Sequence, residues 1–277
     1  MLMCRALEVS ESGYHAWSKR EVSKRAQEDQ ALAEQIEQIF QANRGVYGSP
    51  RIHAELQEQG RRCGRKRIAR LMQERGISAQ RKRRRMRTTD SNHSNPVAPN
   101  LLNREFSAAA PNTKWVTDIT GIETAEGDLY LAAVVDIYSR MAIGWAMGNL
   151  RDEQLVTDAL MMAVARRRPH PGLLHHSDRG SQYTSGGYLA LLKRHGIEVS
   201  MSKKADCYDN ALMESFFGTV KEECVYRQTF RTRSQARQVL FEYLEAFYNR
   251  QRRHSSLGYI SPVTYEQRAK QDAQTDS

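Results

Sequence analysis

Residues 112–148 read NTKWVTDITGIETAEGDLYLAAVVDIYSRMAIGWAMG, and this stretch decides the fold because it predicts three strands in immediate succession. The apolar runs KWVTDITGIET and LYLAAVVDIYSR are separated by the turn-like AEGD, and a third run, MAIGWAMGN, follows at once. Three neighbouring apolar runs joined by such short polar turns are typical of an antiparallel meander.

Helical and strand patterns alternate after this meander. The predicted order is helix, strand, helix, strand and helix, at residues 152–167, 173–178, 185–196, 197–202 and 211–226. Asp152 stands near the start of the first of these helices, and Gly196 ends the second. Three antiparallel strands followed by this alternation predict an α/β fold, namely the ribonuclease H-like mixed five-stranded sheet flanked by helices.

Three short helices are predicted in the N-terminal part of the chain. The first covers residues 27–42, with apolar residues at helical spacing. The second begins with Ser49 as the N-cap and Pro50 at the first helical position, and it ends at Gly60. The third runs from about Gly64 to Arg75. The residues expected to face inward are Leu32, Ile36, Ile39, Phe40, Ile52, Leu56, Ile68, Leu71 and Met72.

These three helices, with a tight connection before the third, resemble a helix-turn-helix. In that motif the N-terminal end of the last helix meets base edges and phosphates. The predicted DNA contacts at that end are Arg65, Lys66, Arg67 and Arg70. An ordinary three-helix bundle with a basic solvent face is the alternative, and the arginine-rich run that follows favours DNA binding.

The net charge of +10 in this 277-residue chain is concentrated in its first third. Residues 1–100 hold 20 Lys and Arg against 11 Asp and Glu, a net of +9, whereas the remainder holds 22 against 21. The densest part is RKRRRMR at residues 81–87, where like charges keep the chain extended unless phosphates neutralise them. The predicted DNA contacts in this run are Arg81, Arg83, Arg84 and Arg85. A solvated basic tail is the alternative to an arm lying along DNA.

Composition excludes several classes of protein. The sequence has no apolar run of about 18 residues that would span a membrane. Its polar N-terminus is not a secretory signal. The four cysteines are scattered without a C-x-x-C pair, which argues against a zinc site and a disulfide framework and favours reduced thiols in a cytosolic protein.

The domain organisation follows from these patterns. We expect a helical, helix-turn-helix-like DNA-binding region, then a basic arm and linker broken by Pro96 and Pro99, then a catalytic core, and finally a C-terminal helix with a basic tail. The expected boundaries are 1–80, 81–111, 112–230 and 231–277.

Three carboxylates stand at positions suited to metal chemistry. Asp118 lies in the first predicted strand, Asp178 just after the fourth, and Glu214 in the last core helix. The first and fourth strands are neighbours in a ribonuclease H-like sheet, and a helix laid across their end brings the third carboxylate near. Such oxygens suit a pair of Mg²⁺ ions that align a nucleophile with a phosphodiester. Each residue taken alone also has an ordinary interpretation. Asp118 could be a strand-edge cap, Asp178 a turn former and Glu214 an exposed helix carboxylate.

Lys221 lies seven residues after Glu214 and therefore on the same helix face, where it is expected to bind a phosphate or, alternatively, to form a surface ion pair. Asp136 suits a sheet-edge role at least as well as metal binding. The predicted role of His175 and His176 is to orient the Asp178 turn. A C-terminal basic cluster is expected to contact DNA or another protomer, and it contains Arg250, Arg252, Arg253 and His254.

Long stretches of the chain resemble the second-reading-frame transposases of the insertion-sequence-three family. The core stretches are HHSDRGSQYTS, MSKKADCYDNALMESFFGTVKEE and YNRQRRHSSLGYISPVTYE. YGSPRIHAELQEQG and RKRIARLMQERGI are similar to the family's helix-turn-helix-like segment, and residues 112–230 resemble its integrase-type core, shared with retroviral integrases. Asp118, Asp178 and Glu214 form a D-D-35-E pattern, because 35 residues separate Asp178 from Glu214, and Lys221 follows seven residues further on.

The resemblance implies specific roles for these residues. Asp118, Asp178 and Glu214 would be the catalytic and metal-binding triad for two Mg²⁺ or Mn²⁺ ions, and Lys221 would contact the transposon end. It also implies transposition by copy-out–paste-in through a circular intermediate, in the bacterial cytoplasm and at the nucleoid when DNA is bound. The expected partners are double-stranded DNA of the transposon ends and target, further copies of this chain in the synaptic complex, and the first-reading-frame product or its fusion.

We therefore expect a DDE-type DNA transposase that cleaves 3′ ends and transfers strands during transposition, integration and recombination of a mobile element. Two alternatives stay open at this point. A repressor of its own element would need only residues 27–79. A ribonuclease H-like nuclease would cut RNA–DNA hybrids.

Overall fold

The computed structural model describes residue 4 and residues 6–79, 97–203 and 207–275. Contacts divide the chain into two compact units, Met1–Ala79 and Gln80–Ser277. The predicted DNA contacts of the arginine-rich run, namely Arg81, Arg83, Arg84 and Arg85, lie outside the described residues.

The first unit contains the helices α2 (Glu11–Ser18), α3 (Lys24–Ala42), α4 (Ser49–Glu58) and α5 (Arg65–Glu74). α3, α4 and α5 pack on one another through the apolar residues that their helical spacing predicts, whereas α2 buries none of its residues. The fully or nearly fully buried side chains are Leu32, Ile36, Ile39, Ile52, Leu56, Ile68, Leu71 and Met72. Phe40, also predicted to face inward, is half-buried.

The predicted start of α4 is one residue too late. Gly48 is the N-cap, in extended conformation, and Ser49 is already the first helical residue, without a side-chain cap hydrogen bond. Pro50 explains the shift, because the ring lacks only an N–H that the first helical turn leaves unpaired and so fits the second position as well as the first.

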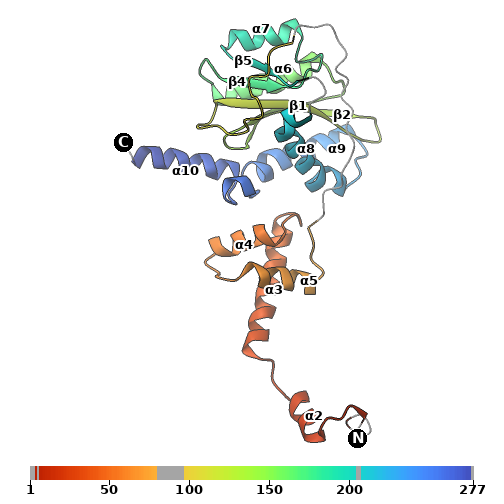
Figure 1. The fold of residues 1–277 in the computed structure, drawn as a ribbon. Coiled ribbons are helices and arrows are strands. Elements are labelled where there is room, and N and C mark those ends of the chain that lie inside the picture. The colour runs from red at the N-terminus through yellow and green to blue at the C-terminus, as the bar shows by residue number, and fades with distance from the viewer. Residues whose placement is uncertain (1–3, 5, 80–96, 204–206, 276–277) are drawn as a thin grey trace. The chain divides into compact units, whose positions relative to one another are not determined.

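The second unit is built on a five-stranded mixed sheet, as predicted (Figure 1). Its strands are β1 (Lys114–Ile122), β2 (Leu129–Asp136), β3 (Ala142–Gly148), β4 (Leu174–Ser177) and β5 (Glu198–Met201), in the order β3-β2-β1-β4-β5. The first three pair antiparallel, and β4 and β5 continue the sheet in parallel with β1. This order is the ribonuclease H-like one that the sequence predicts.

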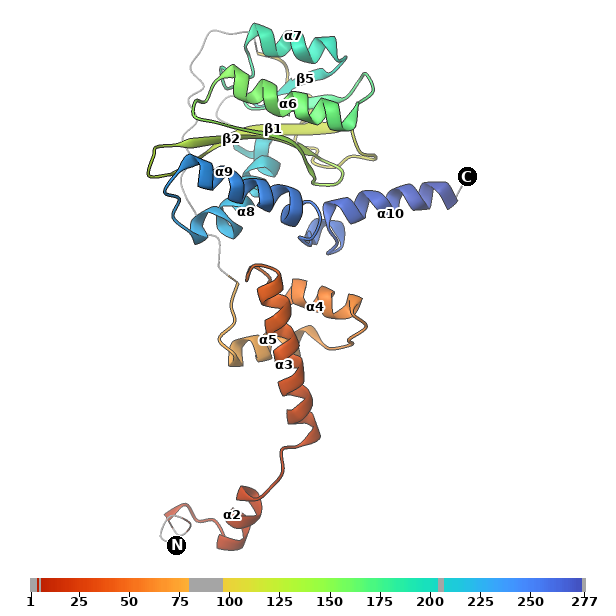
Figure 2. The same cartoon turned by 180° about the vertical axis from the view of Figure 1, so that it is seen from behind.

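Helices cover both faces of this sheet (Figures 1 and 2). One face carries α6 (Glu153–Arg167) and α7 (Gly186–Arg194), and the other carries α8 (Ala211–Glu223) and α9 (Arg233–Glu242). Short 3₁₀ turns precede and follow α8, at η1 (Cys207–Asn210) and η2 (Val225–Arg227). After α9 the chain continues through a π-helical turn, η3 (Tyr243–Tyr248), a 3₁₀ turn, η4 (Ser255–Leu257), and α10 (Pro262–Thr275).

The main core lies between the sheet and α6 and α7. It contains Trp115, Val134, Ile143, Leu155, Leu160 and Tyr188, all at most 4 % exposed. α6 passes so close to β3 that a Cβ at Gly144 would collide with the Ala159 carbonyl oxygen and lie 2.7 Å from the Ala163 nitrogen. A glycine is therefore required there for the helix to seat on the sheet. Asp152 caps α6 by accepting a hydrogen bond from the Leu155 N–H, as predicted.

The two histidines of β4 are buried structural residues. His176 lies 2.8 Å from Ser200 Oγ and 3.2 Å from Ser202 Oγ, which ties β4 to β5. His175 lies on the opposite face, where its Nε2 is 3.1 Å from the Tyr188 hydroxyl. Burial lowers the pKa of His175 to about 3 and that of His176 to about 4. Both rings are thus neutral at pH 7.

Acidification below pH 6.5 should destabilise the fold in part through His175. Its pKa of about 3 lies below the ordinary 6.5, so the unfolded chain takes up a proton first as the pH falls. The stabilisation is complete above pH 6.5 and is lost as the pH falls toward 3, at about 1.4 kcal/mol per pH unit. Denaturant unfolding at several pH values between 7 and 4.5 gives the free energy of unfolding as a function of pH. The slope of this free energy against pH should be shallower for His175→Gln than for the wild type by about this amount. An unchanged slope would contradict burial of a neutral imidazole.

Candidate active site

Asp118 lies in the middle of β1, directly opposite Ala133 of β2. Its side chain is only 3 % exposed, although a carboxylate is costly to bury. One oxygen, Oδ1, accepts a hydrogen bond of 2.8 Å from the Ile119 N–H. The strand therefore fixes this carboxylate within the sheet rather than at its solvent-exposed edge.

Asp178 follows β4 at once, and the register of the sheet sets it beside Asp118. The parallel pairs include Trp115 with His175 and Val116 with His176, and the same register carried two residues further leads to Asp118 and Asp178. The charges of both carboxylates act on Tyr183, which places them at one site. Neighbouring strands are about 4.8 Å apart, and residues at the same parallel level point to the same face. The structure thus brings together two carboxylates that are distant in the sequence.

Asp178 is held by one oxygen and is unpartnered at the other. Oδ1 accepts a hydrogen bond of 2.9 Å from the Gly180 N–H. Oδ2 is buried and has no hydrogen-bond partner among the described residues. A Cβ at Gly180 would lie 3.1 Å from Oδ1 and 2.8 Å from Gln182 Oε1, so a side chain there would crowd this turn. A buried carboxylate oxygen without a donor is suited to a hard cation.

Tyr183 forms part of the same site, and sequence reasoning did not single it out. Its hydroxyl lies 3.3 Å from Thr117 Oγ1, and the residue is fully buried. Burial raises the pKa of the Tyr183 hydroxyl, and the negative charges of Asp118 and Asp178 raise it further. The hydroxyl therefore stays protonated beside both carboxylates. Only its place five residues after Asp178 in the polar turn could have marked it.

Glu214 is in the first turn of α8, which packs against β1. Its side chain is exposed, and Lys221, two turns further along the same face, is half-buried. Within the described parts of the chain, no three His, Cys, Asp or Glu side chains lie close enough to hold a metal ion together. The structure thus brings Asp118 and Asp178 together but does not group Glu214 with them.

A buried carboxylate that sequence reasoning missed, Asp209, anchors the start of α8. It is 2 % exposed and accepts hydrogen bonds from the Lys203 N–H (2.8 Å), Asn100 Nδ2 (2.8 Å) and Arg104 Nε (3.2 Å). Burial alone would raise the pKa of Asp209, but these donors and the Arg104 charge lower it overall. Asp209 therefore joins the segment before β1, the end of β5 and α8 at one point.

The C-terminal end of α8 is fixed by a second carboxylate, that of Glu223, whose side chain is 11 % exposed. Arg252 donates to both its oxygens, at 2.6 and 2.7 Å, and the Tyr243 hydroxyl donates at 2.9 Å. Arg252 is only 3 % exposed, and Arg253, 7 % exposed, donates to the Tyr259 carbonyl oxygen. The expected contacts with DNA or another protomer are therefore wrong for Arg252 and Arg253. Both side chains are buried, one bonded to Glu223 and the other to the Tyr259 carbonyl oxygen.

Two of the predicted DNA contacts in α5 are engaged within the first unit. Arg67 Nε lies 2.5 Å from Asp29 Oδ1, and Arg70 Nη2 lies 2.6 Å from Asp29 Oδ2. These hydrogen bonds, that of Arg70 foremost, lower the pKa of Asp29. Arg65 and Lys66 are exposed on the same helix. The ion pairs fix α5 against α3, and the basic character of its N-terminal end rests chiefly on Arg65 and Lys66.

Comparison with protein-family models gives three matches. The HTH-like domain model matches residues 27–85, and two Integrase core domain models match residues 108–207 and 195–262. None of the helices in the described parts of the chain is long and apolar enough to cross a membrane.

Several curated proteins are similar over nearly the whole chain. The insertion element IS600 uncharacterized 31 kDa protein of Shigella sonnei is 46 % identical, covering 98 % of this chain and all of its own length. Transposase InsF for insertion sequence IS3A of Escherichia coli strain K12 is 42 % identical, covering 95 % of this chain and 92 % of its own.

Two solved structures show distant similarity. The simian T-cell lymphotropic virus intasome in complex with PP2A regulatory subunit B56 gamma aligns with a TM-score of 0.49 at 15 % identity, over 79 % of this chain and 74 % of that one. The HTLV-2 integrase catalytic core domain in complex with magnesium aligns with a TM-score of 0.45 at 14 % identity, over 57 % and 98 %.

Breaking the Glu223–Arg252 pair should be costly. Arg252→Met leaves a buried carboxylate without its cation and should lower the free energy of unfolding by roughly 3–5 kcal/mol. Adding Glu223→Leu should recover most of the loss, because neither charge is then buried alone. The matched control is Arg166→Met, which breaks the more exposed pair with Glu245 and should cost about 1 kcal/mol or less. Equal losses in the two single variants, measured by denaturant unfolding, would contradict this account.

Proposed function

The chain belongs to the insertion-sequence-three (IS3) family of transposases, and we propose that Asp118, Asp178 and Glu214 are the carboxylates with which it cleaves and joins DNA. Its integrase core makes it a DDE-type polynucleotidyl transferase that acts in DNA transposition. The observation that supports the residue assignment best is the unpartnered, buried Oδ2 of Asp178 on the strand next to Asp118.

The proposed metal ligands are these three carboxylates, since Mg²⁺ and Mn²⁺ prefer hard, anionic oxygen. A pair of such ions, when bound, lowers the pKa of the attacking water or hydroxyl and neutralises charge that develops on the phosphate. The hydrogen bond from the Gly180 N–H orients Asp178 so that its other oxygen is available as a ligand. Tyr183 stays neutral and adds no third negative charge beside the two aspartates.

The proposed reaction has two displacements with the same geometry. In the first, a water oxygen bonds to the phosphorus at the end of the element, and the 3′ oxygen leaves as a free hydroxyl. In the second, this 3′-hydroxyl oxygen bonds to a phosphorus of the target strand and displaces another 3′ oxygen. Lys221, on the Glu214 face of α8, would bind a phosphate of the end as a point charge.

The proposed partners follow from this chemistry. The substrate is double-stranded DNA of the element's ends and of the target, and Arg65 and Lys66 of the first unit are exposed for phosphate contacts. Synapsis of two ends calls for more than one copy of the chain. The first-reading-frame product, or its fusion to this chain, would contribute to the recognition of the ends.

Removal of any one of the three carboxylates should abolish cleavage and joining. Asp118→Asn, Asp178→Asn and Glu214→Gln each remove a charge that helps stabilise the transition state by several kcal/mol, about a thousandfold in rate. Labelled oligonucleotides of the element's termini measure both steps in Mg²⁺. Asp158→Asn, an exposed carboxylate of α6, is the matched control and should be fully active. An Asp178→Asn protein that still joined ends would refute the assignment.

Metal binding should stabilise the folded protein independently of DNA. At a Mn²⁺ concentration 100 times the dissociation constant, the wild type should gain about 2.7 kcal/mol and melt at a higher temperature. Asp178→Asn should gain much less, because the oxygen best placed to bind the ion has become part of an amide. Equal thermal shifts for wild type and Asp178→Asn would place the metal elsewhere.

A further inference from the structure

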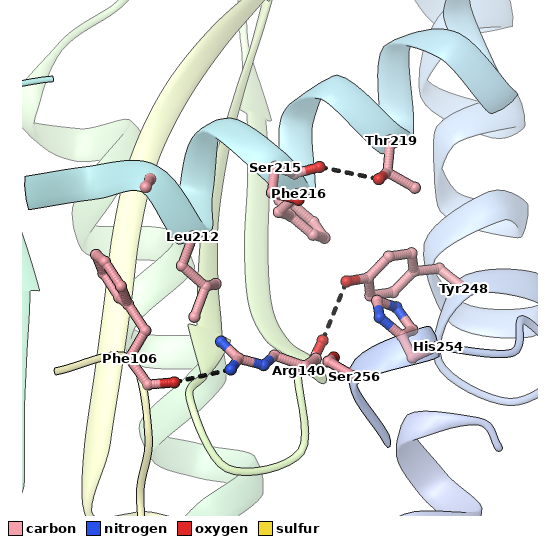
Figure 3. A pocket seen from close by; sticks show the side chains of 10 residues that line it. Phe106, Arg140, Leu212, Ser215, Phe216, Thr219, Tyr248, His254 and Ser256 are labelled. Carbon is pink, nitrogen blue, oxygen red and sulfur yellow. Dashed lines mark hydrogen bonds between the residues drawn. The ribbon is translucent and has the colours of Figure 1, made fainter. Parts of the chain in front are cut away.

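A cavity of about 280 Å³ lies beside α8 in the second unit (Figure 3). Residues advance about 100° per position along a helix, so Phe216 and Thr219 project opposite to Glu214 and Lys221. The walls come from α8, from the segment before β1, from the turn after β2 and from the C-terminal segment. The lining residues outside α8 are Phe106, Arg140, Tyr248, His254 and Ser256.

Arg140 is a half-buried cation that forms no ion pair within the described residues, although the charge of buried Asp136 acts on it through space and partly opposes the lowering of its pKa by burial. Its Nη2 donates a hydrogen bond of 2.8 Å to the Phe106 carbonyl oxygen, the only hydrogen bond of this guanidinium within the described parts of the chain. No carboxylate oxygen in those parts lies within ion-pair distance of it, and burial lowers the pKa of Arg140. A desolvated guanidinium normally has an anionic partner, because removing its hydration is costly. Among the described residues, no acidic side chain of the cavity lining pairs with Arg140, and Asp136 lies outside that lining.

The backbone holds Arg140 in a conformation that disfavours most side chains. Its φ is +61°, in the left-handed region, where a residue other than glycine costs roughly 1–2 kcal/mol. The turn persists because buried Asp136 accepts hydrogen bonds from the Tyr138 and Ser139 N–H groups, and because the Tyr248 hydroxyl donates to the Arg140 carbonyl oxygen. Figure 3 shows the side chain reaching from Tyr248 across to Phe106. These hydrogen bonds hold a residue other than glycine in a strained conformation beside the cavity.

The remaining polar groups of the cavity suit an anion. No Asp or Glu lines it, and the hydroxyls of Ser215 and Ser256 make no hydrogen bond within the described residues. His254 Nε2 lies 2.9 Å from Arg252 Nη1, and because arginine only donates, the imidazole proton belongs on Nδ1. One guanidinium and two hydroxyls are donors of the kind that bind phosphate oxygens.

We propose that this cavity binds a phosphate group of a DNA strand, with Arg140 as its principal donor. The proposal rests on the proposed function, since it adds a DNA contact on the side of α8 opposite to Glu214, the proposed catalytic carboxylate. At about 280 Å³ the cavity takes a single phosphate and its neighbouring atoms, not a length of duplex. A strand held there would border the helix that carries Glu214.

Arg140→Gly is the decisive variant because it removes the guanidinium and also relieves the left-handed strain. It should fold at least as stably as the wild type. Its affinity for duplex DNA should fall about tenfold at fixed salt, the effect of losing charge-assisted hydrogen bonds. Because one phosphate contact is lost, the slope of log K against log salt should become shallower by about 0.9. Fluorescence anisotropy of a labelled terminal duplex and of an unrelated duplex measures both, and both duplexes should respond alike.

Arg168→Gly is the matched control. Arg168 also has positive φ, +45°, at the end of α6, and it is exposed and far in sequence from the cavity residues. This variant loses the same charge and should leave the salt slope unchanged. A slope for Arg140→Gly equal to that of the wild type, or equal changes in both variants, would overturn the proposal.

Free nucleotide is the other source of the same chemistry, and thermal shift with dAMP or inorganic phosphate tests it. Stabilisation of the wild type but not of Arg140→Gly, combined with unchanged DNA slopes, would assign the cavity to a nucleotide and overturn the DNA assignment. These outcomes are separate from the triad's, because the DNA-binding measurements need no metal: the salt slopes can contradict the Arg140 site while cleavage still depends on the triad, and the triad assignment can fail while the salt slopes support Arg140.

Discussion

The parallel pairing of β1 with β4 is the contact on which the candidate active site depends. Asp118 and Asp178 are 60 positions apart in the chain, and only this pairing sets them side by side. Two buried carboxylates at one level of a sheet repel each other and have lost hydration. A divalent cation relieves both penalties, and this is why the unpartnered oxygen of Asp178 is informative. A cation bound to both carboxylates would reduce the repulsion between them.

α8 connects this pair of aspartates to the rest of the unit. Asp209 fixes the approach to the helix, and Glu223 fixes its last turn through Arg252 and Tyr243. Both anchors are carboxylates that accept several hydrogen bonds and so fix the two ends of the helix. One face of α8 carries Glu214 and Lys221, and the opposite side lines the Arg140 cavity. The helix therefore separates the proposed catalytic carboxylate Glu214 from the proposed phosphate site.

Sequence periodicity and turn chemistry were sufficient to predict most of the fold. The alternation of apolar runs from Trp115 to Met201 gave five strands in the right order, and the residues of α3, α4 and α5 at helical spacing are the ones that are buried. Such patterns are local, because a strand or helix buries a face whose period is written in consecutive residues. The N-cap of α4 was missed for the same reason, since Ser49 and Gly48 are both acceptable caps next to Pro50.

The sequence by itself determined the five strands, the helices α3 to α8, the family resemblance and the candidate carboxylates, all of which depend on neighbouring residues or on matched motifs. It did not indicate α2 or α10. Tertiary structure decided which charged side chains form ion pairs within the fold. Asp29 engages Arg67 and Arg70, and Glu223 engages Arg252, whereas Arg140 forms no ion pair within the described parts of the chain. A count of charges along the chain cannot separate these cases, because the energy of an ion depends on which distant group shares its low-dielectric surroundings.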